Sequence, residues 1–136
     1  MSRRAKAIVL DSWAVIAYLS DENSCDNIAE IITNAHENKI PLKISVINVG
    51  EVWYSFAKQT SESEADEVIS ELHELGIEFV DIVWSLTRIA AFYKSKNRMS
   101  YADCFAAALA KQERAELVTG DKEFKQVETD IKINWV

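Results

Sequence analysis

Short apolar segments alternate with longer segments of helical periodicity along this 136-residue chain. The clearest apolar segment is residues 7–10, a continuous run of the kind found in a strand that is buried on both faces. Strands separated by helices at this spacing indicate a parallel sheet with helices on both faces. The sequence therefore predicts one α/β domain over residues 1–136, a three-layer α/β/α sandwich around a central, mainly parallel sheet.

The boundaries of the expected elements follow from the apolar spacing and from local end signals. Ser61 and Glu64 fit a capping box that opens a helix, and Gly76 fits the residue that closes it. The turn at residues 21–24 should supply the N-cap of the second helix. Strands are expected at 7–10, 42–45, 77–80, 116–119 and 132–135, and helices at about 13–20, 25–38, 46–59, 61–75, 84–96 and 100–114.

Composition excludes several function classes. Only three glycines and one proline argue for long helices and rule out Gly-rich phosphate-binding loops. The net charge of -7 argues against binding nucleic acid mainly through the overall field. It does not exclude a nuclease, because clustered carboxylates contribute to that charge and bound divalent cations reverse its sign locally.

The cysteines and histidines lack metal-ligand spacing. We therefore expect Cys25 and Cys104 to be buried free thiols, and His36 and His73 to be exposed helix residues.

The N-terminal residues carry the basic stretch Arg3-Arg4-Ala5-Lys6, but Asp11 interrupts the apolar run that follows it. A signal peptide is therefore not expected. No segment is as long and apolar as a transmembrane helix, so the sequence predicts a cytoplasmic protein with no membrane partner.

Four acidic residues lie next to segments that should be buried. Asp11 follows the first strand and Asp121 follows the strand at residues 116–119. Glu51 and Asp103 fall in the first turns of two helices. Because ligands of open parallel sheets bind outside the carboxyl ends of the strands, we expect these carboxylates to share one cleft. Crowded carboxylates should have at least one raised pKa, and their hard oxygens suit Mg²⁺ or Mn²⁺, as in a metal-dependent phosphodiesterase.

Three of these acids also have a purely structural interpretation. Asp11 could cap the helix after it, and Asp121 could be a turn residue. Asp103 could complete a capping box with Ser100. Glu51 is harder to explain in this way, since its turn is otherwise apolar and a buried carboxylate is costly unless it is paired or metal-bound.

Four short motifs occur in order: I-V-L-D-S at residues 8–12, I-S-V-I-N-V-G-E-V at 44–52, M-S-Y-A-D-C at 99–104 and L-V-T-G-D-K-E-F at 117–124. Together they resemble a PIN domain over essentially the whole chain. The short length and the form of the motifs are similar to the VapC-like ribonuclease toxins of prokaryotic toxin–antitoxin pairs. By this resemblance, the family's catalytic, metal-binding acids are matched by Asp11, Glu51, Asp103 and Asp121, and its small hydroxyl positions by Ser12 and Thr119.

The resemblance implies a metal-dependent endoribonuclease that hydrolyses RNA and leaves 5′-phosphate and 3′-hydroxyl ends. A Mg²⁺ or Mn²⁺ ion held by Asp11 and Asp103 would activate a water for in-line attack, and a second ion would stabilise the leaving oxygen. Glu51 and Asp121 would complete the metal shell directly or through water. Candidates for phosphate contacts, equally well explained as surface charge, are Lys94, Lys96, Arg98 and Lys122.

Trp13 departs from the family pattern, which often has serine or asparagine two residues after the first aspartate. Its indole would narrow the site or stack on a base. It also motivates an alternative function, a PIN-like module that binds RNA or a protein without cutting. Two other classes are not supported: a receiver-type phosphoacceptor needs adjacent acids after the first strand, and a haloacid-dehalogenase-type phosphatase needs Asp-x-Asp.

Aromatic residues are frequent in the early helices, at Trp13, Tyr18, Trp53, Tyr54 and Phe56. A domain of this size seldom exposes such a surface unless something binds there. We expect a homodimer contact or a groove for a VapB-like antitoxin, whose basic side chain would approach the acids. Burial of these residues in the core is the alternative.

Overall fold

The computed structural model describes residues 7–136, so the basic stretch at residues 3–6 lies outside the described part. At its centre is a five-stranded sheet in the order β3-β2-β1-β4-β5. Every neighbouring pair of strands is parallel, so the sheet predicted to be mainly parallel is fully parallel. The strands are β1 (Ile8–Leu10), β2 (Leu42–Ser45), β3 (Ile77–Val80), β4 (Glu116–Thr119) and β5 (Lys132–Trp135).

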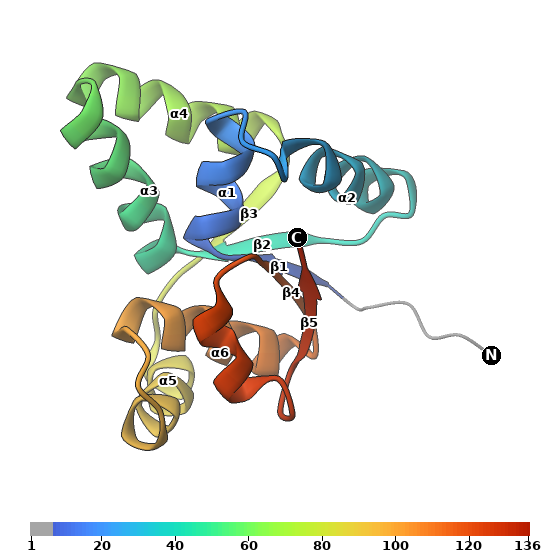
Figure 1. Cartoon of the computed structure of the whole chain (residues 1–136), viewed down its shortest axis with the longest axis vertical. Helices are drawn as coiled ribbons and strands as arrows, with labels where there is room; N and C mark the ends of the chain where they lie inside the picture. The colour runs from blue at the N-terminus through green and yellow to red at the C-terminus, as the bar shows by residue number, and fades with distance from the viewer. Residues whose placement is uncertain (1–6) are drawn as a thin grey trace.

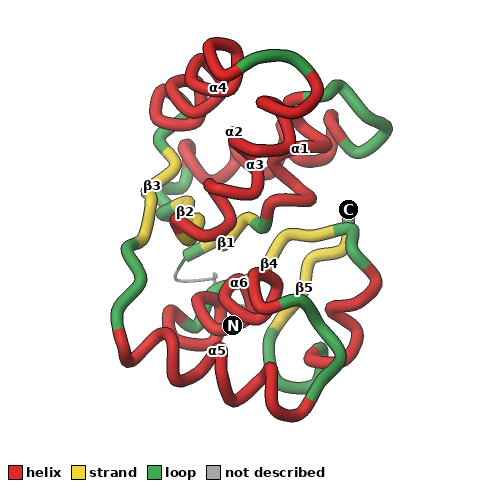
Figure 2. The backbone as a smooth tube through the Cα atoms, turned by 90° about the vertical axis from the view of Figure 1, so that its left-hand side faces the viewer, coloured by secondary structure: helices red, strands yellow, loops and turns green. Residues whose placement is uncertain are grey.

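Helices cover both faces of this sheet and complete the predicted three-layer α/β/α sandwich (Figure 1). Figure 2 shows the same two helical layers after a quarter turn, with the strands between them. None of the helices within residues 7–136 is long and apolar enough to cross a membrane. On one face lie α1 (Ser12–Leu19), α2 (Cys25–Glu37), α3 (Val46–Gln59) and α4 (Glu62–Glu74), and on the other α5 (Trp84–Lys96) and α6 (Tyr101–Glu113).

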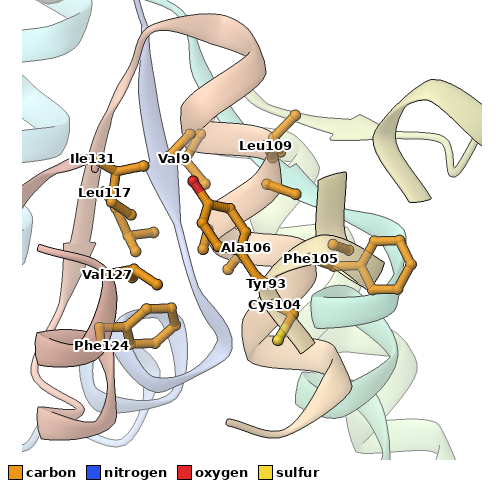
Figure 3. Packing of buried hydrophobic residues seen from close by; sticks show 14 of the residues in the cluster. Val9, Tyr93, Cys104, Phe105, Ala106, Leu109, Leu117, Phe124, Val127 and Ile131 are labelled. Atoms are coloured by element: carbon orange, nitrogen blue, oxygen red, sulfur yellow. The ribbon is translucent and has the colours of Figure 1, made fainter. Parts of the chain in front are cut away.

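Alternate residues of β1 point to opposite faces of the sheet, and both faces are buried. Ile8 and Leu10 pack with α1, α2, α3 and α4, whereas Val9 packs with α5 and α6. Figure 3 shows this second cluster, in which Val9, Leu117 and Phe124 meet the apolar residues of α6. The continuous apolar run at residues 7–10 is explained by this arrangement, since a strand with two buried faces needs no polar alternation.

Local end signals define most of the helix boundaries, as expected. Ser61 Oγ accepts a hydrogen bond from the Glu64 amide (3.1 Å), and Gly76 follows the same helix with a φ of +77°. Ser24, in the turn at residues 21–24, is the N-cap residue of α2 as expected, although its side chain makes no capping hydrogen bond. A 3-10 helix at Lys122–Val127 was not predicted. Such a short 3-10 segment lacks the longer repeat by which an α-helix is recognised.

The cysteine and histidine predictions are largely confirmed. Cys104 is buried and both histidines are exposed. Cys25 is half-buried rather than buried, and its thiol lies 3.4 Å from the Tyr18 carbonyl oxygen. Both cysteines are free thiols, as expected.

The aromatic residues of the early helices form less of an exposed surface than predicted. Trp13, Tyr18 and Phe56 are partly buried against the core beneath α1 to α4, and Trp53 donates its indole N–H to a carboxylate of α4 (2.9 Å). Only Tyr54 in this group is exposed, at 52%. In the described part of the chain, the other large exposed apolar residues are Val83, Trp84 and Phe92 at or in α5, Tyr101 at the start of α6 and Trp135 on β5.

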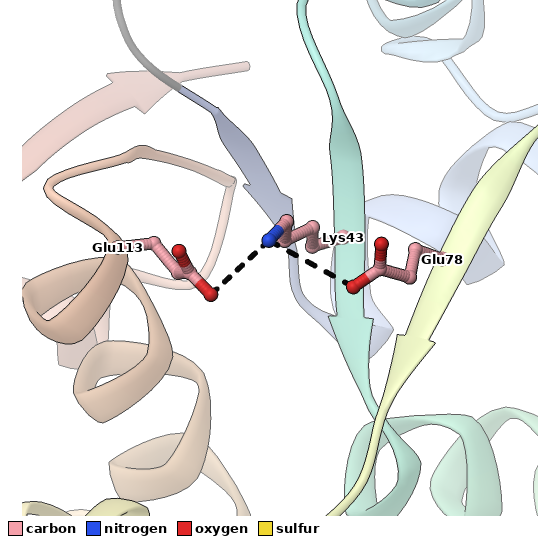
Figure 4. Close-up of polar contacts among 3 residues, drawn as sticks. All are labelled: Lys43, Glu78 and Glu113. Carbon is pink, nitrogen blue, oxygen red and sulfur yellow. Dashed lines mark hydrogen bonds and ion pairs between the residues drawn. The ribbon is translucent and has the colours of Figure 1, made fainter.

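A lysine on β2 joins the sheet to the C-terminal end of α6. Lys43 Nζ lies 3.1 Å from Glu113 Oε1 and 3.7 Å from Glu78 Oε2 on β3 (Figure 4). The side chains of Lys43 and Glu113 are both mostly buried, so solvent screens their contact less than it screens an open surface pair. Because Asp103 lies in the first turn of α6, the contact anchors the opposite end of the helix that carries this acid.

Candidate active site

The four predicted acids come from one edge of the sheet. Asp11 follows β1, Glu51 lies in α3 directly after β2, and Asp121 follows β4. These strands are neighbours, and Asp103 lies in the first turn of α6. After burial, the charges of Asp103 and Asp121 are the causes that raise the pKa of Asp11. The fold therefore brings acids from four separate segments close enough to interact.

Asp11 is the most deeply buried of these acids, with 1% of its surface exposed. Its Oδ1 accepts from the Ala14 amide (2.8 Å) and its Oδ2 accepts from Thr119 Oγ1 (2.5 Å). Burial is the main reason why its pKa rises from 3.8 to about 7, although both hydrogen bonds oppose the rise. Asp11 is thus the N-cap of α1 and a member of the acidic group at once, so the two interpretations do not exclude each other.

Asp103 combines a helix-capping contact with the same charge crowding. Its amide donates to Ser100 Oγ (3.1 Å), which is the N-cap of α6. Burial raises the pKa of Asp103 to about 6, and the charges of Asp121 and Glu51 add to the effect. Helix capping does not require like-charged neighbours, which destabilise the ionised carboxylate, so capping alone does not explain the position of Asp103.

Glu51 is oriented by two neighbours on different elements. Ser12 Oγ donates to Glu51 Oε1 (2.8 Å), and Asn48 Nδ2 donates to the same oxygen (3.0 Å). Asn48 also donates to the Ala102 carbonyl (3.2 Å) and accepts from Ser45 Oγ (2.7 Å). It is fully buried and links α3 to the start of α6.

Sequence reasoning did not identify Asn48 as part of the site. The available signal was its position one helical turn before Glu51, on the side of α3 that also carries Val49 and Val52. A buried amide among apolar residues needs partners, and here its partners are site groups.

The Thr119 hydroxyl group connects Asp11 and Asp121. Besides donating to Asp11, its Oγ1 accepts from the Asp121 amide (3.0 Å). Asp121 Oδ1 in turn accepts from the Glu123 amide (3.0 Å) and caps the 3-10 helix. Both predicted hydroxyl residues, Ser12 and Thr119, therefore contact site carboxylates directly.

Trp13 packs against the backbone next to Asp121. A β-carbon built on Gly120 would lie 2.2 Å from Trp13 Cη2, far closer than atoms can approach. The φ angle of Gly120 is not positive, so its backbone conformation does not require glycine. Glycine is needed here because the Trp13 ring occupies the space that a side chain would fill. The bulky residue at position 13 and the glycine at position 120 are thus fitted to each other.

The Gly120→Ala variant is expected to lower the free energy of unfolding by about 1–3 kcal/mol, the usual range for overpacking. In a Trp13→Ala background the same change should alter stability by less than about 1 kcal/mol, because the methyl group then has room. Urea unfolding of the two single variants and the double variant measures this coupling. Equal effects in both backgrounds would contradict the contact.

The predicted phosphate-contacting residues lie before and after α6. Lys94 Nζ donates to the Met99 carbonyl (2.7 Å), which holds the loop leading into α6. Arg98 is in that loop, where its amide donates to Gln126 Oε1 (2.9 Å). None of the ion pairs within residues 7–136 involves Lys94, Lys96, Arg98 or Lys122.

The donor chemistry of the site suits a hard divalent cation. In the described part of the chain no ion pair neutralises any of the four acids, and their mutual repulsion favours a bound cation. No group of three or more acidic, histidine or cysteine side chains in residues 7–136 is arranged to hold a metal ion. A hydrated ion fits this geometry, because Mg²⁺ keeps several waters and uses one or two carboxylates.

Comparison with known proteins supplies the family. The profile of the PIN domain matches residues 8–129, which is most of the chain, and the protein therefore belongs to the PIN domain family. No match was found among curated protein sequences.

Solved structures share the fold over nearly their whole length. VapBC2 from Rickettsia felis, bound to a DNA fragment from its promoter, gives a TM-score of 0.77 at 17% identity, covering 94% of this chain and 97% of that one. DNA-bound VapBC from Salmonella typhimurium gives 0.72 at 21% identity, covering 94% and 96%. VapC20 from Mycobacterium tuberculosis, described as a sarcin–ricin loop cleaving toxin, gives 0.67 at 14% identity, covering 89% and 95%.

Proposed function

We propose that this protein is a metal-dependent endoribonuclease and the toxin of a toxin–antitoxin pair. The observation that carries the proposal is Asp11, a buried and hydrogen-bonded carboxylate that interacts with further acids at the C-terminal edge of a parallel sheet. Buried carboxylates with raised pKa values are typical of functional sites. Membership of the PIN family and the cleavage activity stated for VapC20 support the same proposal.

The acids have distinct roles in the proposed site. Asp11 and Asp103 would hold Mg²⁺ or Mn²⁺, and Glu51 and Asp121 would complete its surroundings directly or through water. A bound ion would supply charge neutralisation and polarise the scissile phosphate. Asp11 can serve while keeping both hydrogen bonds, since a carboxylate has about four acceptor sites.

Purified protein is expected to cleave single-stranded RNA with Mg²⁺ or Mn²⁺ and to lose essentially all activity in EDTA. Gel analysis of labelled RNA measures the cleavage, and refilling with Mn²⁺ should restore it. The Glu67→Gln variant is a suitable control, because Glu67 is an exposed acid on α4 and its loss should leave activity unchanged. Wild-type activity that survives EDTA would refute the metal-dependent mechanism.

A module that binds RNA or protein without cutting is the second candidate. It is favoured by the absence, within residues 7–136, of a three-ligand metal arrangement. The same assay separates the two functions: this candidate predicts RNA binding in EDTA and no cleavage with either metal.

We also propose a cognate VapB-like antitoxin and a homodimer. The structural neighbours include VapBC complexes and FitAcB from Neisseria gonorrhoeae, and a basic antitoxin segment would complement both the acidic site and the net charge of -7. Exposed Val83, Trp84 and Phe92 offer apolar area for a second chain. Light scattering of the chain alone, and mixed with the product of the adjacent gene, tests both partners. A strictly monomeric chain that binds no such product would count against them.

A further inference from the structure

The indole of Trp13 lies between the acidic site and an open hollow. One edge of its six-membered ring meets Gly120, which directly precedes Asp121. The hollow has a volume of about 450 Å³, within the range of about 300–1,000 Å³ that is usual for small-molecule sites. Besides Trp13, its lining residues are Glu22, Asn23, Ser24 and Val136.

The polar edge of the indole is open to solvent. Trp13 Nε1 donates no hydrogen bond within residues 7–136, and no buried side-chain nitrogen or oxygen in that range lacks a partner. The N–H therefore faces water and not the core. A half-buried tryptophan with a free donor and one open side can bind a planar group.

The charge of the residues that line the hollow favours a nucleobase over a phosphate group. No lysine or arginine is among its lining residues, and Glu22 adds a negative charge, so a phosphate would be repelled. A nucleobase is uncharged, and the π-face of any of the four bases can stack on an aromatic side chain. Amide, hydroxyl and carboxylate groups of Asn23, Ser24 and Glu22 provide partners for the polar edge of a base.

We propose that this hollow binds the nucleobase next to the scissile phosphate, with the base stacked on Trp13. This inference rests on the proposed ribonuclease function and adds a substrate subsite to it. Trp13 is two residues from Asp11 and touches the residue before Asp121, so a base stacked there is adjacent to the acids. The Glu22 carboxylate accepts but cannot donate, and it therefore favours bases with an exocyclic amino group over uracil, whose single N3–H donor is flanked by two carbonyl oxygens that the carboxylate repels.

Two substitutions of Trp13 distinguish the contribution of aromatic stacking to RNA affinity from that of side-chain size. Trp13→Phe keeps an aromatic face and should stay within about 3-fold of wild type in RNA affinity, whereas Trp13→Leu should lose ~10-fold or more, the effect of one lost stacking contact. Fluorescence polarisation with a labelled single-stranded RNA in EDTA measures binding without cleavage. Tyr54→Ala is the control: it removes an exposed aromatic side chain of α3 that does not line the hollow, and it should leave RNA affinity unchanged.

Cleavage of RNAs that differ only in the bases beside the cut tests the specificity. The wild-type protein should cleave least when uridine occupies the bound position. The Glu22→Gln variant should discriminate less against uridine, because the glutamine amide can donate a hydrogen bond to a uracil carbonyl oxygen. Glu22 is exposed, so this substitution should not disturb the fold. Unchanged affinity of Trp13→Leu together with an unchanged cut-site preference of Glu22→Gln would overturn the inference while leaving the ribonuclease proposal intact. A wild type that cleaves no RNA would refute the proposed function, and the binding comparison in EDTA would still decide the role of Trp13.

Discussion

The Asp103→Asn variant is expected to lose ribonuclease activity by about 100-fold or more, since even residues that only support metal ligands are worth about 10- to 100-fold. An amide is a neutral and weaker ligand than a carboxylate, and the change removes a charge that interacts with Asp121 and Glu51. Initial rates on one RNA substrate, at saturating Mn²⁺, measure the loss.

The same variant should keep its fold and be slightly more stable without metal. Asp103 repels Asp121 and Glu51, so removing its charge relieves that repulsion. The amide–Ser100 hydrogen bond is a backbone contact and survives the substitution. Asp26→Asn is a matched control, because Asp26 lies in the first turn of α2 and is exposed. An Asp103→Asn protein as active as wild type would refute the assignment of this acid.

Metal-free protein is expected to become more stable as the pH falls from about 7 toward about 4. The pKa of Asp11 is about 7 in the folded protein against an ordinary 3.8, so the folded state binds its proton more tightly. Between these values the unfolded chain holds fewer protons, and the free energy of unfolding must fall as the pH rises. Asp103, with a pKa of about 6, adds to the same trend over the lower part of this window.

The Asp11 contribution is on the order of 4 kcal/mol across the full window, because one pKa unit corresponds to about 1.4 kcal/mol. Urea unfolding at a series of pH values in EDTA measures the slope. Asp11→Asn should remove most of it, and saturating Mn²⁺ should do so too by occupying the acids. A flat profile for metal-free wild type would show that Asp11 is neither buried nor crowded.

Much of the secondary structure was predictable because it depends on local patterns. Four of the five strands and two of the helices, α3 and α5, have the boundaries that the apolar spacing indicates. Ser61 and Ser100 cap helices as their sequence context suggests. The end of a helix is decided by a few adjacent residues, so the information is local.

The candidate acids were predictable for a related reason. Asp11 and Asp121 each follow a buried strand, and the ends of parallel strands must lie at one edge of the sheet. The order of the strands was not contained in that pattern. The observed strand order places β1 between β2 and β4, and this brings Thr119 next to Asp11 and Ser12 next to Glu51.

Taken alone, the sequence determined the alternation of strands and helices, the parallel sheet and the acids at its edge. Only the tertiary structure decided which side chains meet across long separations: the contact of Asn48 with Ala102, the fit of Trp13 to Gly120, and the partial burial of most early aromatic residues. Apolar periodicity reports which face of an element is buried, but it carries no information on what that face packs against. Those contacts depend on strand order and helix packing, which arise when the whole chain folds.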